Sequence, residues 1–242
     1  MLLLMAGSGE GRRLAQALAD AGVDAVASMA GVTRDPPTLA LPTRRGGFGG
    51  EGPFRRYLID QGITAILDAT HPFAHHISHR TARVARDMGI PYKQLLRPPW
   101  VAQPGDNWTE IADEGQAADI IPAGATVFLA TGRQTLDRFA ALSRCQLICR
   151  QIDPPDAPFP YPNGRYEIGR PPFSQAQETT LFEKLGVDWL VVKNAGGQAS
   201  RTKLDAARAL NIPVLMIARP PQPSGTPVVS VDAALKWVAA QQ

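Results

Sequence analysis

The chain has 242 residues, a formal net charge of +3 and an isoelectric point near 9.1. This length suits one large domain or two small ones, because a single core usually serves about 100 to 200 residues. No block of lysine and arginine resembles a nucleic-acid arm, no run of about 18 apolar residues is present, and MLLLMAG is too short for a signal peptide's apolar region. We therefore expect a soluble, cytoplasmic protein that binds small acidic ligands, without nucleic acid or membrane as a partner.

In the first half of the chain, apolar strand-like runs alternate with helical patterns. This alternation predicts an α/β fold in which helices cover both faces of a parallel sheet. The expected strands are residues 2–7, 24–31, 65–70 and 92–97, and the expected helices are residues 12–22, 54–62 and 75–89.

RPPW at 97–100 then interrupts regular structure, because proline lacks an amide hydrogen and restricts the residue before it. We therefore predict two Rossmann-like domains, with an NADP-binding domain at 1–97 and a substrate-binding domain at 98–242. The proline-rich segments 153–172 and 219–227 are predicted to be connections, and VVSV at 228–231 can pair with either domain.

The second half of the chain repeats the alternation of strands and helices. Its expected strands are residues 126–132, 145–152, 188–193 and 213–219, and its expected helices are residues 133–142, 174–186, 202–211 and 231–242. Cys145 and Cys149 are predicted to share one face of a strand, which is a poor geometry for a disulfide, so we interpret both as reduced packing residues.

The segment LLLMAGSGEGRRLAQAL at 2–18 combines a strand, a turn with three glycines and a helix. Glycine lets the backbone approach a phosphate, and the free amides at the start of a helix attract its charge. The pattern departs from G-x-G-x-x-G, because Arg12 occupies the third glycine position and a glycine precedes it. A tight turn without a ligand is the alternative interpretation. The residues predicted to hold a cofactor here are Gly7, Ser8, Gly9, Glu10 and Gly11.

The end of the second predicted strand distinguishes between nicotinamide cofactors. NAD-binding proteins usually place an acid there to bind the ribose hydroxyls, whereas this chain reads SMAGVTRD, with Ser28, Thr33 and Arg34 nearest the expected position. Since arginine suits a ribose phosphate, Thr33 and Arg34 favour NADP over NAD. Asp35 is the competing residue, and a simple pairing of Arg34 with Asp35 is the alternative.

All four histidines lie in HPFAHHISH, which includes His71, His75, His76 and His79. Histidines four apart on a helix can bind zinc, but neither the glutamate of H-E-x-x-H nor a cysteine pair accompanies them, so we predict no metal. Pro72 suits the first position of a helix, which would place His71 in the turn at the ligand-binding edge of the sheet.

Two further strand-to-helix turns carry polar residues. At a sheet edge, such residues can hold the carboxylates or phosphates of a ligand, although ordinary α/β turns use the same residue types. Because three polar turns follow strand ends, we predict an active-site cleft between the two domains. The substrate-binding residues predicted in the second half are Thr131, Gly132, Arg133, Gln134, Lys193, Asn194, Gly196, Gly197, Thr202 and Lys203.

Six segments in order along the chain resemble the precorrin-6A reductase family of cobalamin biosynthesis. They are MAGSGEGRRLA, ILDATHPFA, LLRPPW, FLATGRQTLDRF, KNAGG and TKLDAARALNIPVLMIARP. The resemblance implies an NADPH-dependent oxidoreductase that reduces a macrocycle double bond at carbons 18 and 19 and gives precorrin-6B. It also implies an anionic tetrapyrrole substrate, whose acetate and propionate groups agree with the basic turns.

The mechanism implied is hydride transfer from NADPH followed by protonation of the neighbouring carbon. The predicted cofactor-binding residues beyond the glycine turn are Ala69, Thr70, His71 and Pro72, and the predicted proton donors are His71 and Lys193. Solvent is the alternative source of the proton.

Two other functions fit the same residues. One is a cobalt-precorrin-6A reductase, which performs the same reduction on a metallated ring. The other is a non-catalytic NADP-binding sensor, although the basic turns of the second half disfavour it. Transient contact with neighbouring enzymes of the pathway also stays open.

Overall fold

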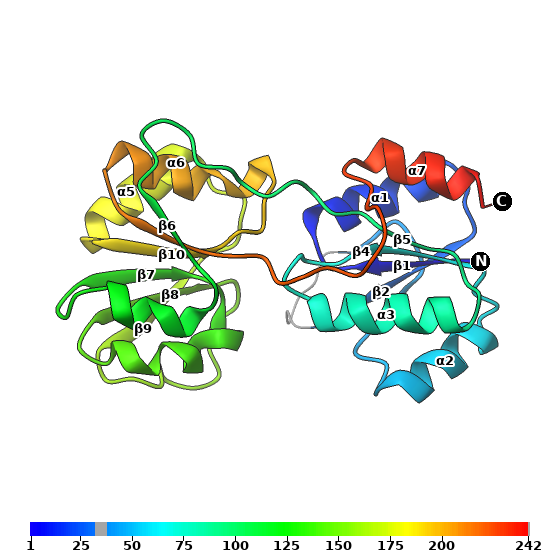
Figure 1. Cartoon of the computed structure of the whole chain (residues 1–242), viewed down its shortest axis with the longest axis horizontal. Helices are drawn as coiled ribbons and strands as arrows, with labels where there is room; N and C mark the ends of the chain where they lie inside the picture. Colours follow the sequence, from blue (N-terminus) through cyan, green and yellow to red (C-terminus); the bar gives the residue numbers. More distant parts are fainter. Residues whose placement is uncertain (32–37, 242) are drawn as a thin grey trace. The chain divides into compact units, whose positions relative to one another are not determined.

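The computed structural model describes residues 1–31 and 38–241 (Figure 1). The chain divides into two compact units, which we call the N-terminal unit (Met1–Pro98 and the segment from Pro220 onward) and the C-terminal unit (Pro99–Arg219). The prediction that 98–242 forms one domain is therefore wrong for the last segment, which belongs to the N-terminal unit. No helix in the described ranges is both long and apolar enough to cross a membrane.

In the N-terminal unit, a parallel sheet has the strand order β3-β2-β1-β4-β5 within the described residues. The strands are β1 (Leu2–Ala6), β2 (Ala25–Met29), β3 (Thr43–Arg45), β4 (Ala65–Ala69) and β5 (Tyr92–Gln94). The central strands β1 and β4 are buried along their whole length, because helices cover both of their faces.

Helices lie on both faces of this sheet (Figure 1). The helices α1 (Gly9–Asp20) and α7 (Val231–Ala239) pack on one face, where Leu14 and Leu18 of α1 and Ala234 and Val238 of α7 join one core. The helices α2 (Glu51–Asp60) and α3 (His75–Asp87) cover the other face. Since α7 carries the apolar side of VDAALKWVA, packing against α1 explains why the end of the chain returns to this unit.

The segment before α7 also joins the N-terminal unit. Leu95, directly after β5, forms a parallel bridge with Val228, and the Leu96 amide donates to the Val228 carbonyl at 2.8 Å. This pairing decides between the two alternatives for VVSV in favour of the first unit.

The C-terminal unit contains a second parallel sheet, with the order β6-β11-β10-β7-β8-β9 within the described residues. Its strands are β6 (Trp108–Ile111), β7 (Thr126–Ala130), β8 (Gln146–Gln151), β9 (Gly164–Ile168), β10 (Trp189–Lys193) and β11 (Val214–Ile217). The helices α5 (Gln175–Leu185) and α6 (Thr202–Ala209) share an apolar core with Phe128, Ile148 and Val192 of the sheet. The unit also contains the helical segments η1 (Glu114–Gln116), α4 (Ala117–Ile120), η2 (Arg133–Leu142) and η3 (Gln198–Ser200).

The two parallel sheets with flanking helices confirm the predicted α/β fold. The structure differs from the prediction at several places in the C-terminal unit, among them the strand β6, which was not predicted. The expected helix at 133–142 is a 3₁₀ segment with non-helical dihedral angles at Thr135, and the expected connection at 153–172 contains the edge strand β9. Cys145 and Cys149 are buried free thiols, as predicted.

Candidate active site

Each sheet has a point where the strand order reverses, and ligands of doubly wound folds usually bind outside the carboxyl ends of the strands at this point. In the N-terminal unit the reversal lies between β1 and β4, where Ala6 pairs with Ala69. In the C-terminal unit it lies between β7 and β10, where Ala130 pairs with Val192. In each unit, the residues predicted to bind cofactor or substrate therefore lie at the ends of the two strands where a doubly wound fold usually binds its ligand.

The glycine turn is attached to the neighbouring strand end by one hydroxyl group. Ser8 is the N-cap of α1, and its Oγ accepts a hydrogen bond from the Gly11 amide at 3.1 Å. The same hydroxyl donates to the Ala69 carbonyl at 2.8 Å. Because one side chain joins the two predicted cofactor-binding segments, the end of β1 and the end of β4 are held together.

Gly11 lies where a larger residue would not fit without a shift. A Cβ atom at this position would be 3.3 Å from both Ala6 Cα and the Ala69 carbonyl oxygen, which are backbone atoms. At Gly9, by contrast, the nearest atom would be the end of the Arg12 side chain at 3.9 Å. Gly11 therefore allows α1 to pack closely on the sheet, the role that the third glycine has in the usual fingerprint. The glycine at this shifted position therefore still allows close packing between helix and strand.

The carboxylate in the glycine turn is paired with arginine. Glu10 forms a partly buried ion pair with Arg97 and a second one with Arg13 at 3.2 Å. Burial raises the pKa of Glu10, but the charges of Arg97 and Arg13 and the hydrogen bonds to this carboxylate outweigh burial and lower the pKa below its usual value. Arg97 is thereby placed beside the turn, and RPPW gave no signal for this because the contact spans 87 positions of sequence.

The DAT segment is held in place by a buried aspartate. Asp68 is fully buried at the end of β4, and its carboxylate accepts from the Thr70 amide at 3.0 Å and from the Tyr92 hydroxyl at 2.8 Å. Burial raises the pKa of Tyr92, and the charge of Asp68 raises it further, so this phenol stays protonated as a donor. Thr70 Oγ1 also lies 3.1 Å from Ser78 Oγ of α3. Sequence reasoning did not select Asp68, although an acid inside an apolar strand is a recognisable signal.

His71 lies in the turn after β4, as predicted, but Pro72 does not begin the helix. Residues 72 and 73 form a turn, the Ala74 amide donates to the His71 carbonyl at 2.7 Å, and α3 starts only at His75. The Phe73 amide donates to His71 Nδ1 at 3.3 Å, which assigns the proton of the neutral ring to Nε2. Pro72 is buried, and its carbonyl accepts from Gln222 at 3.0 Å.

The other histidines do not form a ligand set with further side chains. The His75 and His76 rings lie 3.9 Å apart, and burial, followed by the charge of His76, lowers the pKa of His75. Within residues 1–31 and 38–241, no group of three or more His, Cys, Asp or Glu side chains is placed to hold a metal ion.

Sequence reasoning missed Arg44, an arginine of β3 whose side chain contacts the end of β2. Arg44, in β3, donates to Ser28 Oγ at 2.8 Å and to the Gly46 carbonyl at 2.8 Å, and its guanidinium lies 3.8 Å from the centre of the Phe48 ring. The predicted Thr33 and Arg34 lie outside the described residues. The missed signal was TRR at 43–45, because this short edge strand was not predicted.

In the C-terminal unit, Lys193 lies at the end of β10 among oxygen atoms. Its Nζ contacts the Thr131 carbonyl at 3.2 Å, Thr135 Oγ1 at 3.3 Å and the buried Glu114 carboxylate at 3.5 Å. Burial lowers the pKa of Lys193, and the Glu114 carboxylate offsets part of this effect. The structure therefore brings Lys193 and Thr131 together and adds Glu114, which sequence reasoning did not select.

The turn after β7 combines one buried and two exposed predicted residues. Thr131 is buried, and its Oγ1 has no hydrogen-bond partner among the described residues. The same is true of the side-chain amide of Gln151, the last residue of the neighbouring strand β8. Gln151 lies at the position that matches Thr131, because Leu129 pairs with Cys149. Arg133 and Gln134 are exposed, and Arg133 lies 3.8 Å from Asp156.

The KNAGG turn binds its own chain. The Asn194 side chain accepts from the Trp100 amide at 2.8 Å and donates to the Trp100 carbonyl at 3.0 Å, and the Gly197 carbonyl accepts from the Trp100 indole at 2.9 Å. Gly196 and Gly197 have φ values of 68° and 85°, which favour glycine. The amide of Asn194 thus has a structural partner, and its role toward a substrate stays a prediction.

Thr202 and Lys203, at the start of α6, line a cavity of about 180 Å³ together with Ala130 at the end of β7. These residues lie on the α5 and α6 side of the sheet.

Comparisons with known proteins extend over almost the whole chain. Residues 1–239 match the family described as precorrin-6x reductase CbiJ/CobK. A precorrin-6A reductase of Rhodococcus erythropolis is 46% identical over 98% of this chain and 96% of its own length. A solved structure described as CobK precorrin-6A reductase superposes with a TM-score of 0.95 at 40% identity, covering 99% of this chain and 96% of that one. A cobalt-precorrin-6A reductase of Priestia megaterium is more distant, at 28% identity over 93% of each chain. On this evidence, the chain belongs to the precorrin-6x reductase family.

Proposed function

We propose that the protein is a cytoplasmic enzyme that reduces precorrin-6A to precorrin-6B, with NADPH as the hydride donor and carbons 18 and 19 of the macrocycle as the reacting bond. The observation that carries this proposal is membership of the precorrin-6x reductase family. The described residues also contain a turn that suits a dinucleotide, which supports the same function.

The glycine turn fits the pyrophosphate of a dinucleotide. Gly11 brings the start of α1 close to the sheet, and the positive end of the dipole of this helix favours a phosphate there. The carboxylate of Glu10 would repel a phosphate, but its ion pairs with Arg97 and Arg13 compensate its charge. In this proposal, Gly7 to Gly11 hold the pyrophosphate, and Ala69 to Pro72 border the nicotinamide.

In this proposal NADPH is preferred to NADH because arginine side chains near the end of β2 can bind the ribose phosphate. Arg44 adds positive charge there, although its guanidinium also holds Ser28 and the Gly46 carbonyl. Arg34, with Thr33, stays the proposed partner of the ribose phosphate. Arg34→Ala should weaken NADPH binding about tenfold or more and leave NADH binding unchanged, because a charge-assisted contact contributes about 1.5–3 kcal/mol. Unchanged or tighter binding of NADPH would contradict this assignment.

The reduction adds a hydride and a proton to neighbouring carbons. Bound NADPH supplies the hydride, and the protein supplies alignment and a source for the proton. His71 is proposed as a donor because it lies in the turn after β4, among the residues proposed to border the nicotinamide. It would donate as the imidazolium, so Nδ1 would give up its contact with the Phe73 amide. The Asp68 carboxylate fixes Thr70, the residue before His71, and so limits the positions that the ring can take.

Lys193 is the second proposed donor. Burial lowers its pKa, which makes the ammonium group a better acid than an exposed lysine. Contacts with Thr131, Thr135 and Glu114 hold this group at the point where the strand order reverses. Arg133 is proposed to bind a carboxylate of the macrocycle, and the unpartnered Thr131 Oγ1 and Gln151 amide are proposed as neutral hydrogen-bonding groups for it.

The test is stoichiometric oxidation of NADPH on addition of precorrin-6A, followed by absorbance and by mass analysis of the product. Metal-free and cobalt-containing substrates and both nucleotides should be compared. We expect turnover with the metal-free substrate and NADPH, and preference for the cobalt-containing ring would contradict the proposal.

The proton donor is tested by single-turnover hydride transfer in His71→Ala and Lys193→Ala. General acids typically contribute about 10²- to 10⁴-fold. If both variants kept the wild-type rate and product, the protein-donor proposal would fail and solvent would be the source.

A further inference from the structure

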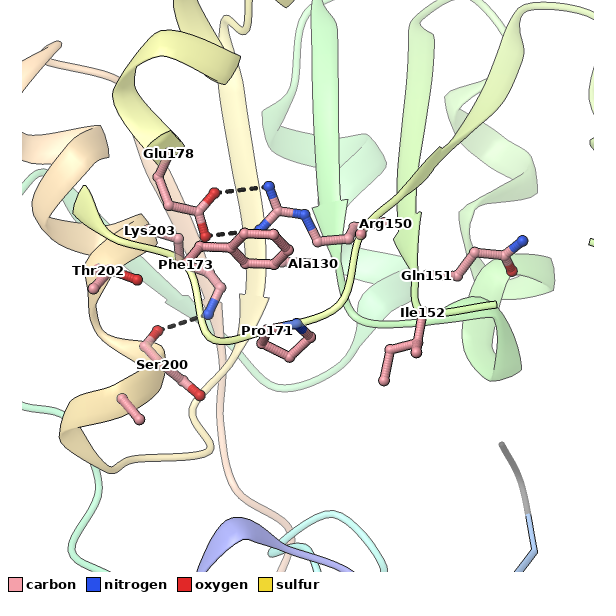
Figure 2. Close-up of a pocket in the computed structure, with 12 residues that line it drawn as sticks. Ala130, Arg150, Gln151, Ile152, Pro171, Phe173, Glu178, Ser200, Thr202 and Lys203 are labelled. Carbon is pink, nitrogen blue, oxygen red and sulfur yellow. Dashed lines mark hydrogen bonds and ion pairs between the residues drawn. The ribbon is translucent and has the colours of Figure 1, made fainter. Parts of the chain in front are cut away.

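The cavity in the C-terminal unit lies at the carboxyl ends of β7 and β8, beside the start of α6 (Figure 2). It has a volume of about 180 Å³, which is smaller than the roughly 300–1,000 Å³ of sites that enclose a drug-sized ligand. The cavity therefore suits one short arm of a larger molecule. Its apolar walls include Ala130, Ile152, Pro171 and Phe173.

A buried ion pair forms the back of this cavity. Arg150 of β8 and Glu178 of α5 make two parallel hydrogen bonds of 2.7 Å, and the Arg150 and Glu178 side chains are only 10% and 1% exposed. The guanidinium also lies 4.8 Å from the centre of the Phe128 ring and 4.5 Å from that of Phe173. Both oxygens of Glu178 are thus engaged by Arg150, and its negative charge is compensated within the pair.

One N–H donor of Arg150 takes no part in the pair with Glu178. Its Nε is buried and has no hydrogen-bond partner in the part of the chain that the structure describes. An unmet donor on a charged group costs free energy in the absence of a ligand or water, because burial removes it from bulk solvent.

The opposite side of the cavity is formed by η3 and the start of α6. Lys203 Nζ donates to the Ser200 carbonyl at 2.6 Å, which fixes the ammonium group on the side of the cavity that Thr202 also lines (Figure 2). No side chain caps the start of α6, so the positive end of the helix dipole adds to the charge of Lys203. Of the three charged residues that line the cavity, two are cationic and one is anionic.

We propose that this cavity binds one carboxylate-bearing side arm of the tetrapyrrole substrate, with its carboxylate at Lys203 and Thr202 and its methylene carbons against Ala130 and Phe173. This inference rests on the proposed function. A positive, partly apolar cavity of this size fits a short aliphatic acid better than a phosphate, which has no apolar part, and the macrocycle itself is too large for it.

The first test is steady-state kinetics of Lys203→Met, which keeps the length of the side chain and removes its charge. We expect KM for precorrin-6A to rise about ten- to hundredfold, the range for one lost charge-assisted contact, with KM for NADPH unchanged. Lys203→Arg restores the charge and should recover part of the affinity. Lys184→Met, which removes the charge of an exposed lysine of α5, is the matched control and should behave as wild type.

The second test fills the cavity without altering charge. Ala130→Leu places extra carbon atoms where the arm would lie, and it should raise KM for precorrin-6A while thermal unfolding remains cooperative. If the wild type turns over precorrin-6A and both Lys203→Met and Ala130→Leu keep its KM, the cavity inference is overturned and the proposed function stands. If the wild type does not oxidise NADPH with this substrate, the proposed function itself fails.

Discussion

The turns that follow the central strands of the two sheets are built differently. After β1, a side-chain hydroxyl caps a regular helix, since Ser8 accepts from Gly11 and α1 runs unbroken from Gly9 to Asp20. After β7, Gly132 has a φ of 76°, no side chain caps the segment, and η2 is a 3₁₀ segment with a non-helical residue, Thr135. The same position in the two units therefore offers aligned amides in one case and an irregular backbone in the other.

The two turns therefore offer different groups to a ligand: backbone amides after β1 and side chains after β7. A regular helix start can bind a phosphate through its amides, which recognise any dinucleotide. The turn after β7 is instead surrounded by side chains with partners of their own, including Lys193, Glu114 and Arg138. Side chains can be arranged for one particular anionic substrate, and this agrees with the proposed roles of the two units.

The largest effect is expected from Gly11→Ala, which breaks the first turn. The added Cβ atom would lie 3.3 Å from backbone atoms of Ala6 and Ala69, so α1 or these strand ends must shift by a few tenths of an ångström. We expect NADPH affinity to fall at least about tenfold and stability to fall by about 1–3 kcal/mol, the usual cost of overpacking. Fluorescence titration with NADPH and urea denaturation measure the two effects.

Gly9→Ala is the matched control for this substitution. It adds the same methyl group two positions earlier, where the nearest atom is the flexible end of Arg12 at 3.9 Å. We expect little change in stability. If Gly9→Ala lowered stability as much as Gly11→Ala, close packing of α1 would not be the reason for the glycine.

An intermediate effect is expected from Asn194→Ala, in the turn after β10. This change removes the side chain that satisfies both the amide and the carbonyl of Trp100, which is 8% exposed. Leaving buried backbone groups unpaired should lower stability by about 1–3 kcal/mol, measured by urea denaturation with tryptophan fluorescence. Asn163→Ala, which removes an exposed contact with Ser143, should cost less than about 0.5 kcal/mol. Equal losses would show that the Trp100 contacts are not important for stability.

Sequence reasoning identified the central strands and the edge strand β5 but missed the strands at the other sheet edges. Strands β1 and β4 are continuous apolar runs, because both faces are covered. The missed strands β3, β6 and β9 are edge strands, and each contains at least one exposed position. Edge strands keep polar residues and short lengths, so their hydrophobic pattern is weak. Arg44 was missed as a site residue for the same reason.

Contacts over long sequence distances explain the other differences. The glycine turn, His71 and Lys193 could be selected because a site residue after a strand is visible in local sequence. The pairing of Glu10 with Arg97, of Lys193 with Glu114, and of α7 with α1 joins segments that no local pattern connects. The assignment of residues 220–242 to the second domain was wrong because only the apolar face of α7, once packed, shows where this helix belongs.

The smallest effect is expected from Glu10→Gln, which tests whether the charge of the first turn is compensated as proposed. Arg97 and Arg13 lower the pKa of Glu10 below its usual value of 4.5, so its ionised form stabilises the fold above this pH. That contribution is lost as the pH falls through the lowered pKa of the folded state. Because the group is partly solvent-exposed, the difference between wild type and Glu10→Gln at neutral pH should be at most about 1 kcal/mol, and it should vanish in acid.

Glu183→Gln removes an exposed carboxylate of α5 that has no ion pair among the described residues, and it should leave the pH profile parallel to wild type. A parallel profile for Glu10→Gln as well would show that Arg97 does not stabilise this carboxylate, and the turn would then present a negative charge to the pyrophosphate.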